Sequence, residues 1–141
     1  MAEIKVQQHF SVGAETVWAQ VGDPGAIADW IPSVATARME QEIRHLVFAD
    51  GQPARERIAE HSDRDRRYTY EYIDGPLPLK QYRSTISVLD ATSEACTVDW
   101  TATFSAEAEE VESELAAAIE EIYRAALEEL STIVSNPSVR G

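Results

Sequence analysis

The chain has 141 residues, the size of one domain, and its hydrophobic fraction of 44% is enough for a sizeable core. Twelve basic against 25 acidic residues give a net charge of −13, which disfavours binding to nucleic acid and to anionic membranes. No apolar run approaches the roughly 20 residues of a membrane span. The N-terminus lacks a signal segment, and the single cysteine, Cys96, cannot form an internal disulfide. We therefore expect a cytoplasmic protein without membrane insertion.

The first third of the chain predicts one strand followed by two short helices. Residues 3–11 alternate between polar and apolar side chains, which indicates a strand with one buried face. Residues 14–21 form a short amphipathic segment, and a second short helix over 26–29 follows Asp23 and Pro24, which suit a helix start. Trp30 comes directly after it. We expect Trp30 either at the entrance of a cavity or as a wedge that holds the short helices in place.

The middle of the chain predicts six further strands, each bounded by polar or glycine-containing turns. Residues 97–105 show the clearest alternation, with Val98 and Trp100 on the inward side, and Asp50-Gly51 is a strong hairpin signal. Consecutive strands joined by short turns make an antiparallel meander. The predicted strands cover residues 33–41, 42–49, 54–61, 67–73, 81–89 and 97–105.

The last third predicts one long amphipathic helix over residues 107–134. Its apolar residues recur at steps of three and four, and nine glutamates occupy the other, solvated faces. A long helix with one apolar face needs a large partner surface, which the strands supply. We therefore predict an α+β domain over residues 1–135, in which a curved seven-stranded antiparallel sheet grips this helix around a cavity, and a flexible tail over 136–141. The apolar positions are Val111, Leu115, Ile119, Ile122, Ala126, Leu130 and Ile133.

Several short motifs, taken in their order and spacing, carry a resemblance to a known family. The chain resembles the START-like (SRPBCC) superfamily, which has the helix-grip fold of birch-pollen-type plant allergens. More narrowly, it resembles the bacterial polyketide cyclase/dehydrase and lipid-transport family. The resemblance covers nearly the whole chain and implies an apolar ligand cavity more firmly than an enzyme; no cofactor is implied. The motifs are Ala14-Glu15-Thr16-Val17-Trp18, Trp30-Ile31-Pro32, Arg44 ahead of Ala49-Asp50-Gly51, Arg55-Glu56-Arg57-Ile58, Tyr70-Glu71-Tyr72, Pro76-Leu77-Pro78 with Tyr82, and Val98-Asp99-Trp100.

The side chains expected to face the cavity are mostly aromatic. Tyrosine brings apolar area together with a hydroxyl group that needs a partner when buried, which suits a ligand with some oxygen atoms. The alternative is that the rings simply fill the core. The candidate ligand-binding residues are Trp30, Arg44, Phe48, Tyr68, Tyr70, Tyr72, Tyr82, Trp100, Phe104, Ile119 and Tyr123.

Arg44 and Glu56 form the candidate polar end of the pocket. If Leu46 and Ile58 face inward, strand alternation turns Arg44 and Glu56 inward as well, and the hairpin between their strands places them side by side. A register slip of one residue would reverse one of the two faces. Because a buried ion pair contributes little to stability, the pair suggests ligand orientation or proton transfer. The alternative is a structural or rim-exposed pair.

Three functions remain open at this point. The leading hypothesis is a monomer or homodimer that binds a small, mostly hydrophobic ligand, either a lipid or an aromatic polyketide-like metabolite. The first rival is a cyclase/dehydratase-type enzyme without cofactor, with Glu56 and Tyr70 as catalytic candidates and Tyr70 or Tyr82 stabilising an enolate. The second rival is a protein-partner or chaperone-associated domain that uses the acidic helix face. No metal site is expected, because the histidines lack metal-ligand spacing and one cysteine cannot build a zinc site.

Overall fold

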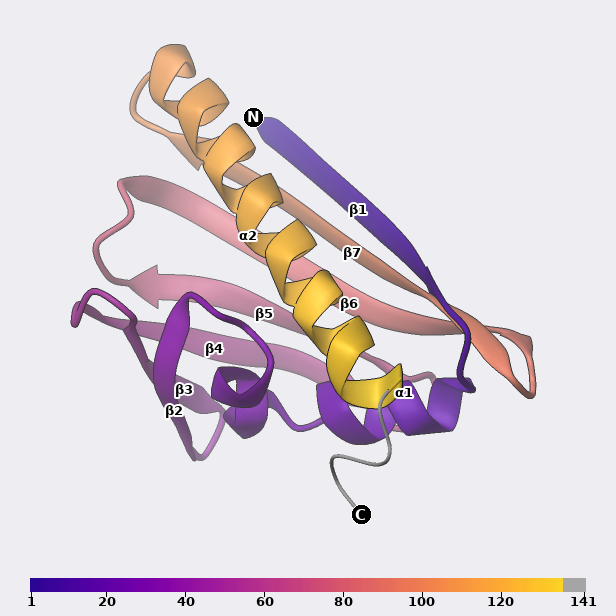
Figure 1. The fold of residues 1–141 in the computed structure, drawn as a ribbon. Helices are drawn as coiled ribbons and strands as arrows, with labels where there is room; N and C mark the ends of the chain where they lie inside the picture. The colour runs from indigo at the N-terminus through magenta and orange to yellow at the C-terminus, as the bar shows by residue number, and fades with distance from the viewer. Residues whose placement is uncertain (136–141) are drawn as a thin grey trace.

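In the computed structural model, which describes residues 1–135, seven strands form one antiparallel sheet that curves around a long C-terminal helix (Figure 1). The predicted tail over 136–141 lies outside the described residues. The strands are β1 (Ala2–Phe10), β2 (Val34–Glu40), β3 (Ile43–Phe48), β4 (Pro53–Ser62), β5 (Arg67–Asp74), β6 (Leu79–Thr92) and β7 (Ala95–Ala106). The helices are α1 (Ala14–Val21), the 3-10 helix η1 (Pro24–Asp29) and α2 (Glu109–Ser135).

The sheet confirms the predicted meander. Its spatial order is β1-β7-β6-β5-β4-β3-β2, so β2 to β7 follow one another and β1 closes the far edge beside β7. Short polar turns join the consecutive strands, which is why each pairs antiparallel with the next. The alternation on β7 is also as predicted, because Val98 and Phe104 are fully buried on its inner face.

The second short helix differs from the prediction in type and in start. It begins at Pro24 and is a 3-10 helix, where the sequence predicted a helix over 26–29. The side chain of Asp23 accepts a hydrogen bond from the backbone N–H of Gly25, and Pro24 needs no donor in the first turn. A segment of six residues between these constraints and Trp30 favours the tighter helix.

Helix α2 begins at residue 109, two residues later than predicted, and turns a slightly different face to the core. The carboxylate of Glu112 accepts a hydrogen bond from the backbone N–H of Ala106 and forms an ion pair with the Met1 amino group. These two contacts connect the start of the helix to β7 and to the start of β1. The predicted positions Val111, Ile122 and Ile133 are only partly buried. The buried face consists of Leu115, Ile119, Tyr123, Ala126, Leu127, Leu130 and Val134.

Helix α2 runs obliquely over the inner face of the sheet and contacts β1 and β7 (Figure 1). The helix η1 packs against β2 at the other edge. The inner faces of β3 to β6 therefore lie between α2 on one side and η1 on the other. No helix among residues 1–135 is both long and apolar enough to cross a membrane.

We expect Leu130→Ala on α2 to lower the free energy of unfolding by about 2–5 kcal/mol, because it removes a fully buried side chain from a packed core. Leu89→Ala is the matched control, since Leu89 is 45% exposed, and it should change stability by no more than about 0.5 kcal/mol. Urea denaturation followed by circular dichroism measures both. Equal losses for the two variants would contradict the packing of α2 on the sheet.

Candidate functional site

A cavity of about 70 Å³ lies between the inner face of the sheet and α2. One water occupies roughly 30 Å³ of liquid and drug-sized ligands fill about 300–1,000 Å³, so the cavity holds only a few atoms as it stands. Its lining is mostly apolar, with one charged pair. The lining residues are Ile27, Ile31, Ser33, Val34, Arg44, Leu46, Phe48, Glu56, Tyr70, Tyr72, Leu77, Leu79, Tyr82, Trp100, Ile119, Ile122 and Tyr123.

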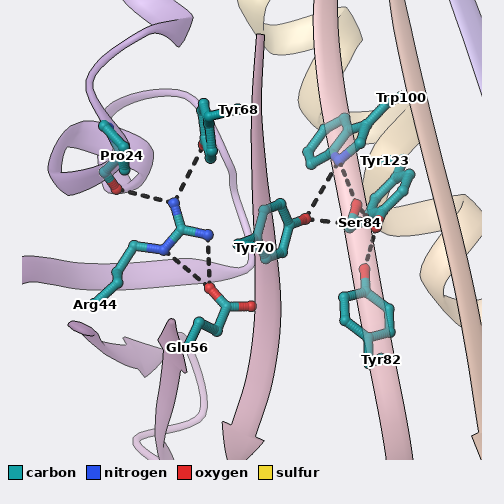
Figure 2. A network of polar contacts seen from close by, with 9 residues as sticks. All are labelled: Pro24, Arg44, Glu56, Tyr68, Tyr70, Tyr82, Ser84, Trp100 and Tyr123. Carbon is teal, nitrogen blue, oxygen red and sulfur yellow. Dashed lines mark hydrogen bonds and ion pairs between the residues drawn. The ribbon is translucent and has the colours of Figure 1, made fainter. Parts of the chain in front are cut away.

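Arg44 and Glu56 lie directly opposite each other on β3 and β4, in the register that turns both side chains inward. Arg44 donates from Nε at 2.9 Å and from Nη2 at 2.7 Å, and both bonds end on Oε1 of Glu56. Its Nη1 donates to the carbonyl of Pro24 at 3.0 Å and to the hydroxyl of Tyr68 at 3.2 Å (Figure 2). One guanidinium group thus connects β3, β4, β5 and η1.

The electrostatics of this pair follow from its burial. Arg44 is 2% exposed and its guanidinium lies 4.7 Å from the ring centre of Tyr70. Burial is the largest single influence and lowers the pKa of Arg44, but the attraction of Glu56 together with the contributions of Tyr68 and Tyr70 outweighs it and leaves the pKa above its ordinary value. Arg44 is therefore permanently charged, and its charge is balanced locally by the carboxylate of Glu56.

A second polar group, here called the hydroxyl cluster, consists of Tyr70, Tyr82, Ser84, Trp100 and Tyr123. The Tyr123 hydroxyl lies 2.8 Å from the Ser84 hydroxyl and also bonds the Tyr82 hydroxyl. The indole N–H of Trp100 donates to Ser84 at 3.1 Å and to Tyr70 at 3.3 Å, and its ring stacks on Tyr123 at 3.9 Å (Figure 2). Four strand residues and one helix residue are joined at the centre of the molecule.

The tyrosines of the cluster remain neutral at physiological pH. Burial is the largest cause that raises the pKa of Tyr70, and it raises the pKa values of Tyr82 and Tyr123 well above the usual value. Neighbouring negative charge adds to the effect, from Glu56 in the case of Tyr70. These hydroxyl groups therefore act as hydrogen-bond donors and acceptors, and not as bases.

The structure brings most of the predicted site residues to the cavity and leaves three outside it. Those that line it are Arg44, Phe48, Glu56, Tyr70, Tyr72, Tyr82, Trp100, Ile119 and Tyr123. Those that do not are Trp30, Tyr68 and Phe104. The alternation of strand residues places a side chain on the inner face, but it does not decide whether that side chain meets the cavity or a neighbouring element.

Each of the three residues outside the cavity has a packing role. Trp30 is not at an entrance, because it is 1% exposed and packs on Trp100 with ring centres 5.4 Å apart. Its indole N–H has no hydrogen-bond partner among the described residues. Tyr68 lies against Trp18, and its hydroxyl accepts a hydrogen bond from Arg44. Phe104 is fully buried beside the ring of Tyr82.

Sequence reasoning missed several lining or supporting residues. Ser84 could have been found, because it alternates with Tyr82 on the inward face of β6, but nothing in the pattern marks it as the centre of a hydrogen-bond network. Leu77 lies in the Pro76-Leu77-Pro78 turn, where no periodicity exists. Ile27 lies within the short 3-10 helix η1, and Ile31 follows it. Among residues 1–135 no group of three or more His, Cys, Asp or Glu side chains could hold a metal ion.

A comparison with known protein families shows to which family this chain is related. The pattern of the family described as polyketide cyclase / dehydrase and lipid transport matches residues 1–134. The chain belongs to this family. No curated protein matches the chain significantly.

Solved structures support the same fold for this member of the polyketide cyclase / dehydrase and lipid transport family. The protein XoxI from Bacillus cereus is 27% identical, with a TM-score of 0.91 over 98% of this chain and 99% of that one. A START superfamily protein from Mycobacterium smegmatis is 10% identical, with a TM-score of 0.79 over 95% and 97%. The Zhui aromatase/cyclase from Streptomyces sp. R1128 is 14% identical, with a TM-score of 0.79 over 97% and 95%. The helix-grip, START-like fold predicted from the sequence is thereby confirmed.

The tyrosine hydroxyl groups of the folded chain should lose their protons at a higher pH than those of the unfolded chain. The pKa values of all five tyrosines are raised, with burial the largest cause, so we expect the folded chain to resist tyrosinate formation beyond the ordinary pKa of about 10. The unfolded chain releases these protons first. The contribution of the tyrosines to stability is therefore constant below about pH 10 and is lost as the pH rises through their folded pKa values. Tyrosinate absorbance in buffer and in guanidinium measures the difference, and coincident titrations would contradict it.

Proposed function

We propose that this chain binds a small, mostly hydrophobic ligand, a lipid or an aromatic polyketide-like metabolite, in the cavity between the sheet and α2. The mostly apolar lining with one charged pair is typical of a small-molecule site, and the family supports the same function. Trp100 and Tyr82 contact Tyr123 of α2, and the cavity that remains beside this contact favours ligand binding over a protein-partner domain, in which the rings would leave no void against the helix.

The observation that carries the proposal is the arrangement of Glu56 at the cavity wall. Both hydrogen bonds from Arg44 end on Oε1, which leaves Oε2 as an acceptor for another donor. A buried ion pair costs desolvation energy and adds little net stability, so its position in the lining of an apolar cavity needs a further reason. Orientation of a bound molecule supplies that reason.

A ligand larger than a few atoms requires side chains at the mouth of the cavity to move. Phe48, Leu77 and Ile122 are half-buried lining residues at this position. The Tyr72 hydroxyl accepts from the backbone N–H of Leu77 at 3.0 Å and donates to its carbonyl at 3.3 Å. Gly75, at φ +155°, lets this turn approach closely, since a Cβ there would lie 2.5 Å from the Tyr72 hydroxyl.

A larger side chain on α2 that fills the cavity should prevent ligand binding. We expect Ile122→Trp to weaken the affinity for the neutral fluorophore N-phenylnaphthylamine by at least about tenfold, because the indole occupies the ligand's space. Glu121→Trp is the matched control: the neighbouring position is exposed, and its affinity should equal that of the unaltered chain. Fluorescence titration measures both. Equal binding by the two variants, or no binding by the unaltered chain, would reject the cavity as the site.

The enzyme alternative has one specific observation in its favour, which is that Glu56 and Tyr70 line the same cavity. A ketone placed there could lose an α-proton to Oε2 of Glu56 as the C–H bond breaks. The neutral hydroxyl of Tyr70 would then donate a hydrogen bond to the enolate oxygen. No cofactor takes part in this step.

Hydrogen exchange tests the enzyme alternative directly. With β-tetralone in heavy water, we expect α-hydrogen exchange above the buffer rate, and Glu56→Gln should lower it by about a hundredfold or more, because the general base is lost. Glu60→Gln is the control, since Glu60 is exposed on the same strand and should leave the rate unchanged. Proton NMR follows the exchange. A rate equal to that of buffer leaves binding as the function.

A further inference from the structure

The direction of each hydrogen bond in the hydroxyl cluster follows from one acceptor, the backbone carbonyl of Thr101. A carbonyl only accepts, so the single hydroxyl proton of Ser84 goes to Thr101 at 2.9 Å. The Ser84 oxygen must then accept from its other partners, which are the Trp100 indole at 3.1 Å and the Tyr123 hydroxyl at 2.8 Å. The Tyr123 proton is therefore committed to Ser84.

This assignment leaves one hydroxyl proton of the cluster for the cavity. Because Tyr123 donates to Ser84, its oxygen accepts from Tyr82, and the Tyr82 proton is committed as well. The Tyr70 oxygen accepts from the Trp100 indole, while its proton has the Tyr123 oxygen only at 3.5 Å, the outer limit of a hydrogen bond. Tyr70 is thus the tyrosine of the cluster that can donate to a ligand.

An unused acceptor lies on the same face of the sheet as this donor. Glu56 on β4 lies on the same sheet face as Tyr70 on β5, because Tyr70 pairs with Ile58, two residues beyond Glu56. The Cα atoms of such diagonal neighbours are about 7–8 Å apart, a distance that long side chains can span. Figure 2 shows the second carboxylate oxygen of Glu56 directed away from Arg44, while the first carries both bonds from it. A single ligand oxygen between the two residues could therefore accept from Tyr70 and donate to Glu56.

The charges at this position exclude one common class of hydrophobic ligand. The positive charge of Arg44 is balanced by Glu56, and four of its donated bonds already go to protein acceptors. A carboxylate would meet the negative Oε2 without a free cation to offset it. A hydroxyl group, in contrast, both donates and accepts.

From this geometry we infer that the cavity selects neutral, hydroxyl-bearing apolar molecules and discriminates against carboxylates, with Glu56 and Tyr70 as the specificity-determining residues. The inference rests on the proposed ligand-binding function and names the chemical class of the ligand. Alcohols and phenols are accepted, while fatty acids and aromatic acids are disfavoured.

Three single-ring probes of nearly equal shape test this selectivity in the intact chain: para-cresol, para-toluate and toluene. We expect para-cresol to bind at least about tenfold more tightly than either of the others at neutral pH, because only its hydroxyl can bond both residues and hydrogen bonds to a charged group are strong. NMR titration of the tryptophan indole N–H signals measures this. The Trp100 signal reports on the cavity, and the Trp18 signal, bonded to Asp63 at the surface, is the internal reference.

Glu56→Gln should invert the preference. Glutamine keeps the shape and an oxygen for Arg44 but removes the negative charge, so we expect para-toluate to gain at least about tenfold in affinity while para-cresol weakens. Tyr70→Phe is the second variant: it should weaken para-cresol without improving para-toluate. Glu60→Gln is the control for the loss of charge, since Glu60 is exposed on the same strand as Glu56, and it should keep the preference for para-cresol.

The outcomes separate this inference from the proposed function. Equal or tighter binding of para-toluate by the unaltered chain overturns the selectivity and leaves ligand binding in place. An unchanged preference in both Glu56→Gln and Tyr70→Phe overturns the roles of these residues. A Trp100 signal that responds to none of the three probes also overturns the inference, and the N-phenylnaphthylamine titration then decides separately whether the cavity binds any ligand.

Discussion

The buried bond between Arg44 and Glu56 is the interaction on which the arrangement of the site depends. Through one guanidinium group it fixes the register of β3 against β4, holds η1 by the carbonyl of Pro24 and holds β5 by Tyr68. Removing Glu56 would leave the charge of the fully buried Arg44 uncompensated, at a cost of about 3–5 kcal/mol. The polar end of the cavity is therefore rigid, and its one unused acceptor has a fixed position.

The fold could be predicted from the sequence because its signals are periodic. The alternation on β5, β6 and β7 and the steps of three and four on α2 each repeat several times, so an error at one residue does not change the element. The same alternation placed Arg44 and Glu56 inward and opposite each other, which the pairing of β3 with β4 confirms. Their functional roles remain predictions.

The shape of the site could not be predicted in the same way. Alternation assigns a side chain to a face of the sheet, but the elements that cover that face decide what it contacts. Tyr68 is directed to α1 and Phe104 into the core, while Tyr123 reaches from α2 and fills much of the expected space. Leu77 lies in a turn without any period. The cavity volume results from these contacts, which are set by three-dimensional packing.

The bonds from Tyr72 to Leu77 have a consequence for how fast a guest could be exchanged. One hydroxyl group holds both the N–H and the carbonyl of the same residue, so a displacement of the Tyr72 side chain breaks both bonds together. The residence time of a guest would then be governed by the frequency of this displacement, and chains that bind with equal strength could differ widely in the speed of capture and release.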